Sequence, residues 1–346
     1  MRILVDSHTI GQNEGGIERY IKNVLISLEK IVPIGAVLYK KPTFPLKKST
    51  KTYYVYPNDF FRLFIIPFIL IFQGYDTYFS NYTTPFFKPR GKKYIITLHD
   101  VSYIPQKKLF SLRDRLLFLT ILPYSLALAD IIIVPSNFVR REASKWYPQH
   151  AHKIRVVYEG VDTDILACKE IPKDRPPRMI INIQGLYFLC INSKNQRKNI
   201  DLIVQAFHRL TNKHIKLIIV GGRRNITSRI IDKRIRILPY VNDHALAYLY
   251  KNAHALIYYS SYEGFGLPVI ESIANSTPVI ASDIPSLREI AKKYITFVPL
   301  NNLAALSEIL RITASKTKEK MVVDLNHFPY SWKRTAKKIV EIVDTV

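Results

Sequence analysis

Short apolar runs alternate with longer amphipathic stretches along nearly all of the 346 residues. The runs have the length and composition of strands, and the stretches between them have helical spacing. Such alternation predicts parallel sheets built from βαβ units. The predicted strands are 2–6, 36–39, 52–56, 77–80, 93–98, 131–135, 154–157, 187–192, 216–220, 235–238, 255–259, 279–281 and 296–298. The predicted helices are 16–29, 113–129, 136–147, 200–210, 243–252, 268–274, 302–317 and the closing 332–346.

A change of composition between residues 158 and 178 divides this pattern in two. Gly160 and three prolines mark the segment as a linker. We therefore predict an α/β protein of two doubly wound, Rossmann-like parallel-sheet domains, residues 1–160 and 179–330, joined by a linker at 161–178. Because ligands bind at the carboxyl ends of the strands in such sheets, we expect a central cleft faced by both domains to hold the functional site.

The longest apolar stretch, Phe60–Phe72, contains Arg62 and Pro67 and is too short to span a bilayer. It fits a buried helix or an interfacial one. We favour burial, because the strand-like segment 75–79 follows it directly.

Residues 259–271, with the sequence YSSYEGFGLPVIE, carry the densest candidate chemistry. The start of a helix offers backbone N–H groups and the positive end of a dipole, which suit a phosphate, and Pro268 fits the first turn of a helix. Glu263 and Glu271 can each accept two hydrogen bonds from neighbouring sugar hydroxyls. The combination predicts a nucleotide-sugar site. The alternative is an ordinary strand-to-helix turn with two solvated glutamates.

Three further segments follow predicted strands. Gly15 and Gly16 allow close backbone approach to a ligand, although the G-x-G-x-x-G spacing of a dinucleotide site is missing and a strained turn without ligand is the alternative. His99 ends a strand, where a lone histidine is otherwise usually structural. Arg197 and Lys198 precede a helix and can neutralise a diphosphate leaving group, unless they are simply an exposed basic pair.

Taken in order, these segments resemble the family 4 retaining glycosyltransferases, which have the GT-B fold. Glu263–Glu271 matches the E-x7-E signature of that family, Gly15–Arg19 its GG-x-E-R segment, and His99-Asp100 its acceptor-side His-Asp pair. The segment before residue 200 matches its strand–loop–RKN pattern. The helix near 331–346 matches one that crosses back to brace the first domain.

The resemblance implies an acceptor-binding first domain and a donor-binding second domain. It implies that His99 contacts the transferred sugar. The other implied contacts are those of Glu263 with sugar hydroxyls, Glu271 with ribose hydroxyls, and Gly15, Gly16, Arg197, Lys198 and the backbone of Phe265, Gly266 and Leu267 with the diphosphate.

The chain departs from the family pattern at two positions. Asn192 stands where the family usually has glycine; asparagine tolerates a left-handed backbone, but its side chain could change the approach to the diphosphate. Ser276 replaces the glycine of a G-T-P-V turn. The pattern does not identify which upstream cation binds the diphosphate together with Arg197 and Lys198, and Lys194 is a candidate. Ser282 lies near the expected nucleotide pocket, but the pattern assigns it no role.

Net charge and cysteine usage bound the partners and the compartment. The formal charge of +24, spread over both halves, favours anionic partners such as phospholipid head groups, diphosphates or nucleic acid, unless it is merely a lysine-rich solvated surface. Cys168 and Cys190 form no disulfide framework, and no leader pattern precedes the first strand, so we expect a cytoplasmic protein. Asp162 and Asp164 formally give D-x-D, but their place in the linker argues against a metal site.

We therefore expect a metal-independent, cofactor-free retaining hexosyltransferase. The expected donor is GDP-mannose or a UDP-sugar, with mannose the first choice. The expected acceptor is a hydroxyl of a saccharide or lipid-linked saccharide in cell-surface polysaccharide or glycolipid synthesis, reached by peripheral docking at the inner face of the cytoplasmic membrane. The alternatives are a catalytically silent scaffold of the same fold, a basic nucleic-acid-binding protein, and a sugar phosphorylase. The sequence has no zinc-finger spacing and no RNP-like motif, which argues against nucleic-acid binding.

Overall fold

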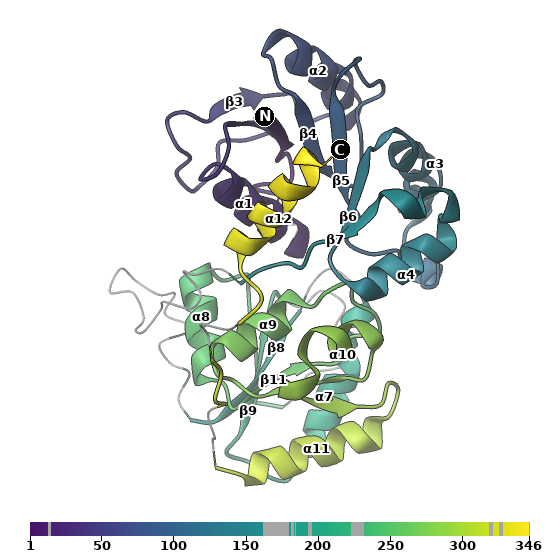
Figure 1. The fold of residues 1–346 in the computed structure, drawn as a ribbon. Helices are drawn as coiled ribbons and strands as arrows, with labels where there is room; N and C mark the ends of the chain where they lie inside the picture. Colours follow the sequence, from purple (N-terminus) through teal and green to yellow (C-terminus); the bar gives the residue numbers. More distant parts are fainter. Residues whose placement is uncertain are drawn as a thin grey trace. The chain divides into compact units, whose positions relative to one another are not determined.

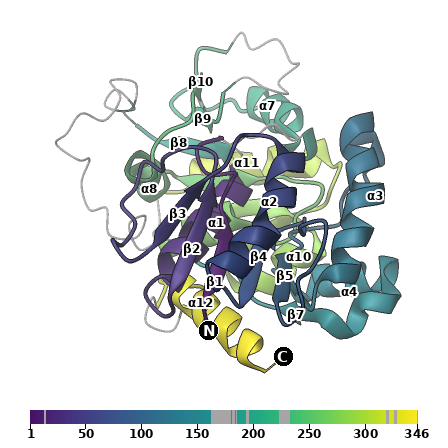
Figure 2. The same ribbon diagram turned by 90° about the horizontal axis from the view of Figure 1, so that it is seen from above.

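The fold is seen in a computed structural model, in which the chain forms two compact units (Figures 1 and 2). The first unit contains Met1–Gly160 and Tyr330–Val346, and the second contains Val161–Pro329. The structure describes residues 1–12, 15–161, 180, 183, 185–192, 196–222, 232–317, 321–324 and 328–345, without the side chains of 113 and 114. The predicted linker 161–178, Asp162, Asp164, Cys168 and Lys194 lie outside these residues, apart from Val161.

The first unit has one parallel sheet in the order β3-β2-β1-β4-β5-β6-β7. The order reverses between β1 and β4, as it does in doubly wound folds. The strands are β1 (Ile3–Asp6), β2 (Ile34–Leu38), β3 (Lys51–Tyr54), β4 (Thr77–Asn81), β5 (Lys93–Thr97), β6 (Ile131–Val134) and β7 (Ile154–Val156). The helices are α1 (Gly16–Leu28), α2 (Asp59–Phe72), α3 (Leu112–Leu128), α4 (Asn137–Trp146) and α12 (Trp332–Asp344), with 3-10 turns at Lys107–Leu109 and Pro148–Lys153.

The helices α2, α3 and α4 cover one face of this sheet (Figure 2). Ile66 and Leu70 of α2 pack with Tyr78 and Tyr94 of the sheet, and Leu128 of α3 joins the same cluster. A second cluster buries the inner sides of α3 and α4 against β5 and β6. Because all three helices lie on one face, their exposed side chains form the outer surface of a single layer.

The carboxy-terminal helix α12 packs beside α1 in the same unit (Figure 1). Thr335 Oγ1 donates to the backbone oxygen of Tyr158 at 2.8 Å, and the Trp332 ring lies edge-on to Tyr20. A Cβ atom at Gly160 would come within 2.1 Å of the Trp332 nitrogen, so the start of α12 fits only against glycine. The two chain segments of the unit are therefore tightly joined.

The helix α2 corrects the expectation for Phe60–Phe72. Leu63, Ile66 and Leu70 are buried on the sheet, whereas Phe60 is 70% exposed and Phe72 is 78% exposed. A helix that is apolar all round cannot bury every face against one sheet. The expectation of burial is therefore right for only one side of this helix.

The second unit repeats the architecture with the parallel order β10-β9-β8-β11-β12-β13, which reverses between β8 and β11. Its strands are β8 (Tyr187–Ile191), β9 (Lys216–Val220), β10 (Ile235–Leu238), β11 (Ala255–Tyr258), β12 (Val279–Ser282) and β13 (Ile295–Val298). Its helices are α7 (Ile200–His208), α8 (Asp243–Asn252), α9 (Leu267–Ala274), α10 (Pro285–Ala291) and α11 (Leu303–Ser315), with 3-10 turns at Gln196–Lys198 and Lys292–Tyr294. The prediction of two Rossmann-like parallel-sheet domains is confirmed, although the seven-residue α10 was missed.

Candidate functional site

The candidate residues of the second unit gather at the carboxyl ends of β8 and β11, where the strand order reverses. The turn Gln196–Lys198 follows β8, and the loop 259–266 follows β11. Ser261 N donates to the backbone oxygen of Arg197 at 2.8 Å, and Asn199 Nδ2 donates to that of Tyr259 at 3.1 Å. The structure therefore brings together two loops that lie about 60 residues apart in the sequence.

A buried ion pair joins the two loops. Lys198 Nζ lies 2.7 Å from Glu263 Oε1, and both side chains are largely buried. The same nitrogen donates to the Tyr258 hydroxyl at 2.6 Å and lies 4.2 Å from the centre of that ring. Desolvating two charges costs several kcal/mol each, which only close pairing and further hydrogen bonds offset. The sequence suggested Lys198 and Glu263 separately, but it gave no sign of their pairing or of Tyr258.

The charge balance in this cluster favours the ionised carboxylate. Burial raises the pKa of Glu263, but Lys198 and Arg197 outweigh burial and hold it below its ordinary value. Burial lowers the pKa of Lys198, and Arg197 adds to this, so Glu263 offsets the shift only in part. Ion pairing alone would raise the pKa of the lysine. The lowered value has a direct cause, because burial and the neighbouring cation act in the same direction.

Glu271 is held separately, inside α9. Its side chain is 1% exposed, and the Tyr250 hydroxyl of α8 donates to its Oε2 at 2.9 Å. Tyr250 was missed by the sequence analysis, since nothing in the pattern of α8 marks it. Because Glu263 is also buried, the alternative of an ordinary turn with two solvated glutamates is wrong.

The start of α9 presents backbone rather than side chains. Gly266 has a φ of +106°, and a Cβ atom there would lie 2.7 Å from the Leu287 side chain. Phe265 and Leu267 are buried, so their side chains belong to the core. The helix begins at Leu267 with Pro268 in its first turn, as predicted. A helix start suits an anion because the positive end of the helix dipole lies there. In α9, Pro268 has no N–H, and Val269 N already donates to the backbone oxygen of Gly266 at 2.9 Å.

Asn192 follows β8 without adopting a left-handed backbone. Among described residues other than glycine, positive φ values occur at Tyr82, Asn199, Ser276 and Asn301. Asn192 Nδ2 instead donates to the backbone oxygen of Gly222 at 2.9 Å. A Cβ atom at Gly221 would come within 2.5 Å of the Asn192 backbone oxygen. Asn192 and the pair Gly221-Gly222 therefore connect the ends of β8 and β9. The position of Asn192 directly after a strand could have indicated this role.

The second departure, Ser276, does occupy the left-handed region. Its φ of 58° falls in the turn between α9 and β12. The backbone there suits glycine, which is what the resembling sequences carry. Ser282, at the end of β12, donates its hydroxyl to the backbone oxygen of Ser260, which ties two loops together.

In the first unit, His99 lies beyond the carboxyl end of β5 in a polar cluster. Its Nδ1 is 3.2 Å from Glu159 Oε1, and its Nε2 is 3.0 Å from Asn81 Oδ1. The Tyr20 ring packs edge-on against the imidazole at 4.6 Å. Glu159 and Asn81 were not proposed as partners, although both follow or end strands at the same edge of the sheet. Three neighbours therefore fix the orientation of His99.

Other residues named from sequence have local roles. Asp100 Oδ1 accepts from the Ser102 backbone at 2.9 Å and closes a turn. Gly15 precedes α1 with a φ of +65°, and Gly16 is the first residue of that helix. The positive φ explains glycine at position 15. Nothing in the structure explains glycine at position 16, where a Cβ atom would have open space around it.

A buried charged cluster that the sequence did not reveal lies at the end of β1. The Arg62 guanidinium contacts Asp6, and the Tyr78 hydroxyl donates to Asp6 Oδ2 at 2.7 Å. Burial raises the pKa of Asp6, but Arg62 and His8 outweigh it and hold the pKa well below its ordinary value. The carboxylate is therefore ionised although it is fully buried.

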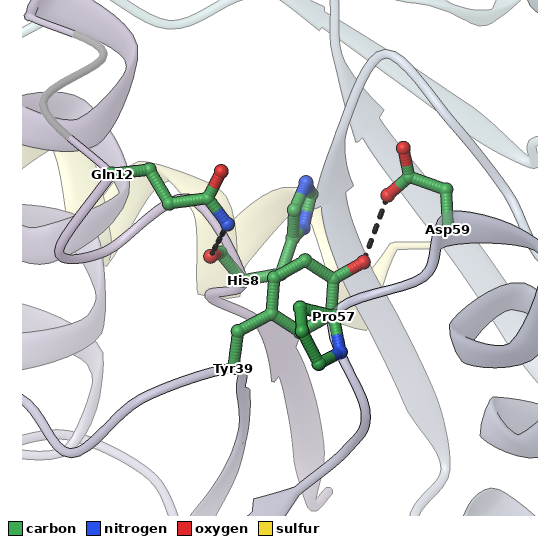
Figure 3. A pocket seen from close by; sticks show the side chains of 5 residues that line it. All are labelled: His8, Gln12, Tyr39, Pro57 and Asp59. Atoms are coloured by element: carbon green, nitrogen blue, oxygen red, sulfur yellow. Dashed lines mark hydrogen bonds between the residues drawn. The ribbon is translucent and has the colours of Figure 1, made fainter.

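Two adjoining cavities open beside this cluster. One of about 200 Å³ is lined by His8, Gln12, Tyr39, Pro57 and Asp59 (Figure 3). In Figure 3 the Tyr39 hydroxyl donates to Asp59 Oδ1, at 2.8 Å, and Gln12 Nε2 donates to the backbone oxygen of His8, at 2.9 Å. The other, of about 230 Å³, lies between α2 and α3 and shares His8 and Asp59 with the first.

Two Rossmann-like units, the second with buried acidic groups and a helix start at its switch point, define the class of GT-B proteins. Two family models match the chain, "Glycosyltransferase Family 4" over residues 15–165 and "Glycosyl transferases group 1" over residues 171–322. The chain belongs to the family 4 glycosyltransferases.

The alignments with two bacterial relatives cover only part of each relative. O-antigen chain mannosyltransferase B of Escherichia coli is 29% identical over 255 residues, which are 68% of this chain and 65% of that protein. O-antigen chain mannosyltransferase RfbU of Salmonella typhimurium is 30% identical over 213 residues, which are 58% of this chain and 55% of that protein. The chain therefore aligns with less than two thirds of either relative.

Solved structures share the fold over the whole chain. Sucrose-phosphate synthase of Thermosynechococcus elongatus has a TM-score of 0.74 at 19% identity, covering 100% of this chain and 98% of that one. Anabaena HepE, in complex with UDP and glucose, has a TM-score of 0.73 at 15% identity and 100% coverage of both chains. At these identities the likeness concerns the fold alone.

Two other kinds of feature are absent from the described part of the chain. No group of three His, Cys, Asp or Glu side chains is placed to hold a metal ion there. Within the same residues, the helices are too short or too polar to cross a membrane.

Proposed function

We infer that this protein transfers a hexose from a nucleotide-diphosphate sugar to a hydroxyl group of a saccharide or lipid-linked saccharide. The observation that carries the inference is the pair of buried glutamates around the start of α9, one of them paired with Lys198. Buried carboxylates next to a helix start combine acceptors for sugar hydroxyls with donors for phosphate.

The donor side of the proposal rests on the second unit. Glu263 accepts hydrogen bonds from the transferred sugar, and Glu271, oriented by Tyr250, accepts them from the ribose hydroxyls. Arg197, Lys198 and the backbone N–H groups of Phe265, Gly266 and Leu267 bind the diphosphate, with no metal or cofactor. The contacts of Gly15 and Gly16 with the diphosphate and of His99 with the sugar stay predictions.

The reaction breaks the bond between the anomeric carbon and the diphosphate oxygen and forms one to the acceptor oxygen. The acceptor proton moves to the departing phosphate, and front-side displacement retains the configuration. Negative charge grows on the diphosphate as the bond breaks, so cations at fixed positions lower the barrier. If Lys198 moves from Glu263 toward the diphosphate during the reaction, the same cation serves first the sugar site and then the leaving group.

Mannose from GDP-mannose is the first choice of donor, because both O-antigen relatives are named as mannosyltransferases. UDP-glucose is the competing donor chemistry, given the HepE complex. Synthesis of a cell-surface polysaccharide or glycolipid, in the cytoplasm and at the inner face of its membrane, belongs to the same proposal.

The test measures donor binding and transfer together. In a thermal-shift screen against GDP, UDP, GDP-mannose and UDP-glucose, the ligands that carry one of the two nucleotides should raise the melting temperature of the protein. Glu263→Gln should lower kcat by about 10²-fold or more, the scale for loss of one preorganised transition-state contact. Lys198→Met should also lower kcat, because it removes a cation from the leaving group. Lys292→Met, which replaces an exposed lysine outside the cluster, is its matched control. Salt-dependent nucleic-acid binding without nucleotide affinity, or donor binding without any turnover, would overturn the proposal.

A further inference from the structure

The outer surface of the α2–α3 layer is unusually apolar. We call this surface the α2–α3 patch and define it by the exposed side chains of α2, α3 and the connecting Phe87. Its members are Phe60, Phe61, Phe64, Ile71, Phe72, Phe87, Leu112, Leu116, Leu117, Leu119 and Tyr124. In contrast, the exposed large apolar residues described in the second unit are Leu186, Tyr240, Ile312 and Val322.

Contacts of both helices with the segment 86–87 make the patch continuous. Phe60 of α2 packs against Phe86 at 5.0 Å between ring centres, and Phe68 packs against Phe87 at 5.8 Å. The Tyr124 hydroxyl of α3 donates to the backbone oxygen of Phe86. The segment 86–87 therefore bridges α2 and α3.

The exposed area is larger than a monomeric surface normally carries. The five phenylalanines of the patch alone expose roughly 560 Å², taking about 200 Å² for a full side chain. Surface patches on soluble monomers are usually limited to a few hundred Å². Such a surface calls for a partner.

Charges at the edge of the layer favour an anionic partner. No charged residue occurs between Arg62 and Asp76 or between Arg115 and Asp130. Lys107 and Lys108 are exposed just before α3, and α4, in the same layer, exposes Arg140, Arg141, Lys145 and Trp146. The first unit as a whole contains 27 Lys and Arg against 13 Asp and Glu, a formal charge of +14.

These features fit a lipid surface better than a second copy of the chain. Phenylalanine, leucine and tryptophan with lysine and arginine at the edge are typical of interfacial helices. Each basic group near an anionic bilayer adds to the attraction. A two-fold dimer through the patch would instead bring the same basic edges together, and like charges at an interface are costly.

We propose that the α2–α3 patch is a docking surface for an anionic phospholipid bilayer and that the cavity between α2 and α3 receives a lipid-linked acceptor. The cavity runs from Leu117, Phe118 and Leu122 to the polar groups of His8 and Asn81. Its apolar end lies against the patch. The acceptor part rests on the proposed function, whereas the docking part does not.

The experiment is flotation of the full chain with vesicles of phosphatidylcholine, with and without phosphatidylglycerol. The test variant is Leu112→Glu/Leu116→Glu/Leu119→Glu, and the matched control is Leu186→Glu/Ile312→Glu/Val322→Glu. Both replace three exposed apolar residues and change the charge by the same amount. We expect binding to anionic vesicles at low salt to fall at least about tenfold in the test variant and to change little in the control. Circular dichroism checks that both variants are folded.

Lys107→Gln/Lys108→Gln probes the charge separately and should weaken binding to anionic vesicles only. Equal binding by the test variant and the control would overturn the proposal. So would a dimer, seen by analytical ultracentrifugation, that the test variant abolishes while vesicles are not bound. Transfer to a short, water-soluble acceptor is measured in parallel. Intact transfer without vesicle binding refutes docking alone, and vesicle binding without donor turnover refutes the proposed function alone.

Discussion

Removing Glu263 should destabilise the second unit more than any other single truncation in its candidate site. The Lys198 ammonium pairs with the Glu263 carboxylate at 2.7 Å. Glu263→Ala removes this partner and leaves the ammonium buried beside Arg197. Breaking a buried ion pair from one side costs about 3–5 kcal/mol. Lys198→Met/Glu263→Leu removes both charges, so we expect it to cost less than the two single substitutions together.

The two units can be followed separately, because both tryptophans, Trp146 and Trp332, lie in the first. Hydrogen exchange of the β8 and β11 amides reports the second unit. At the lower limit of about 3 kcal/mol, the most protected of these amides should exchange roughly a hundredfold faster in Glu263→Ala, since 1.4 kcal/mol corresponds to a factor of ten. Tryptophan fluorescence should give an unchanged unfolding transition. If exchange in β8 and β11 changes less than about threefold, which is under 1 kcal/mol, the pair is not the buried contact described here.

The pH dependence gives an independent check with a defined sign. The pKa of Glu263 is lower in the folded protein than in the unfolded chain, so the unfolded chain binds more protons in the acid range. The stabilising contribution is therefore complete above the ordinary glutamate pKa and is lost as the pH falls through the lowered value. Glu263→Gln should flatten this acid-side loss of protection in β8 and β11. Glu308→Gln should change it much less, because the pair of Glu308 with Arg311 is exposed on α11 and screened by solvent.

Three further substitutions test the backbone and the hydrogen bonds of the second unit. Gly266→Ala should destabilise it by about 1–2 kcal/mol, because φ is positive there, and should weaken donor binding measured by calorimetry. Ser276→Gly should raise the free energy of unfolding by up to about 1 kcal/mol, measured by chemical denaturation, while Ser286→Gly inside α10 should lower it; a destabilising Ser276→Gly would contradict the left-handed backbone. Tyr250→Phe should cost about 1 kcal/mol and reduce nucleotide affinity, and unchanged affinity would show that the orientation of Glu271 does not matter.

The sequence predicted the sheets well because their central strands, such as β1, β4, β11 and β12, are short runs buried on both faces. Strand order and register could not be predicted, since they depend on pairings between segments far apart in the chain. The same limit applies to the candidate site. Glu263 is recognisable from its loop, but its burial depends on Lys198, which lies 65 residues earlier. The two faces of α2 also could not be told apart, because apolar residues occur on both.

Buried charge occurs at the same topological position in both units. Asp6 and Arg62 meet at the end of β1, beside the switch to β4, and Lys198 and Glu263 meet between β8 and β11. Loops leave the sheet in opposite directions at such a point, so polar groups there are not covered by a crossing helix. Ionisable groups with strongly shifted pKa values cluster at functional sites, although structural ion pairs shift pKa values as well. The α2–α3 patch is the reverse case, because apolar side chains of the kind that a core buries are exposed there. The patch lies beside the cavity that Arg62 helps to line. The first unit therefore places a cavity with a polar end and an apolar surface next to each other, which is the arrangement that the proposed docking of a lipid-linked acceptor requires.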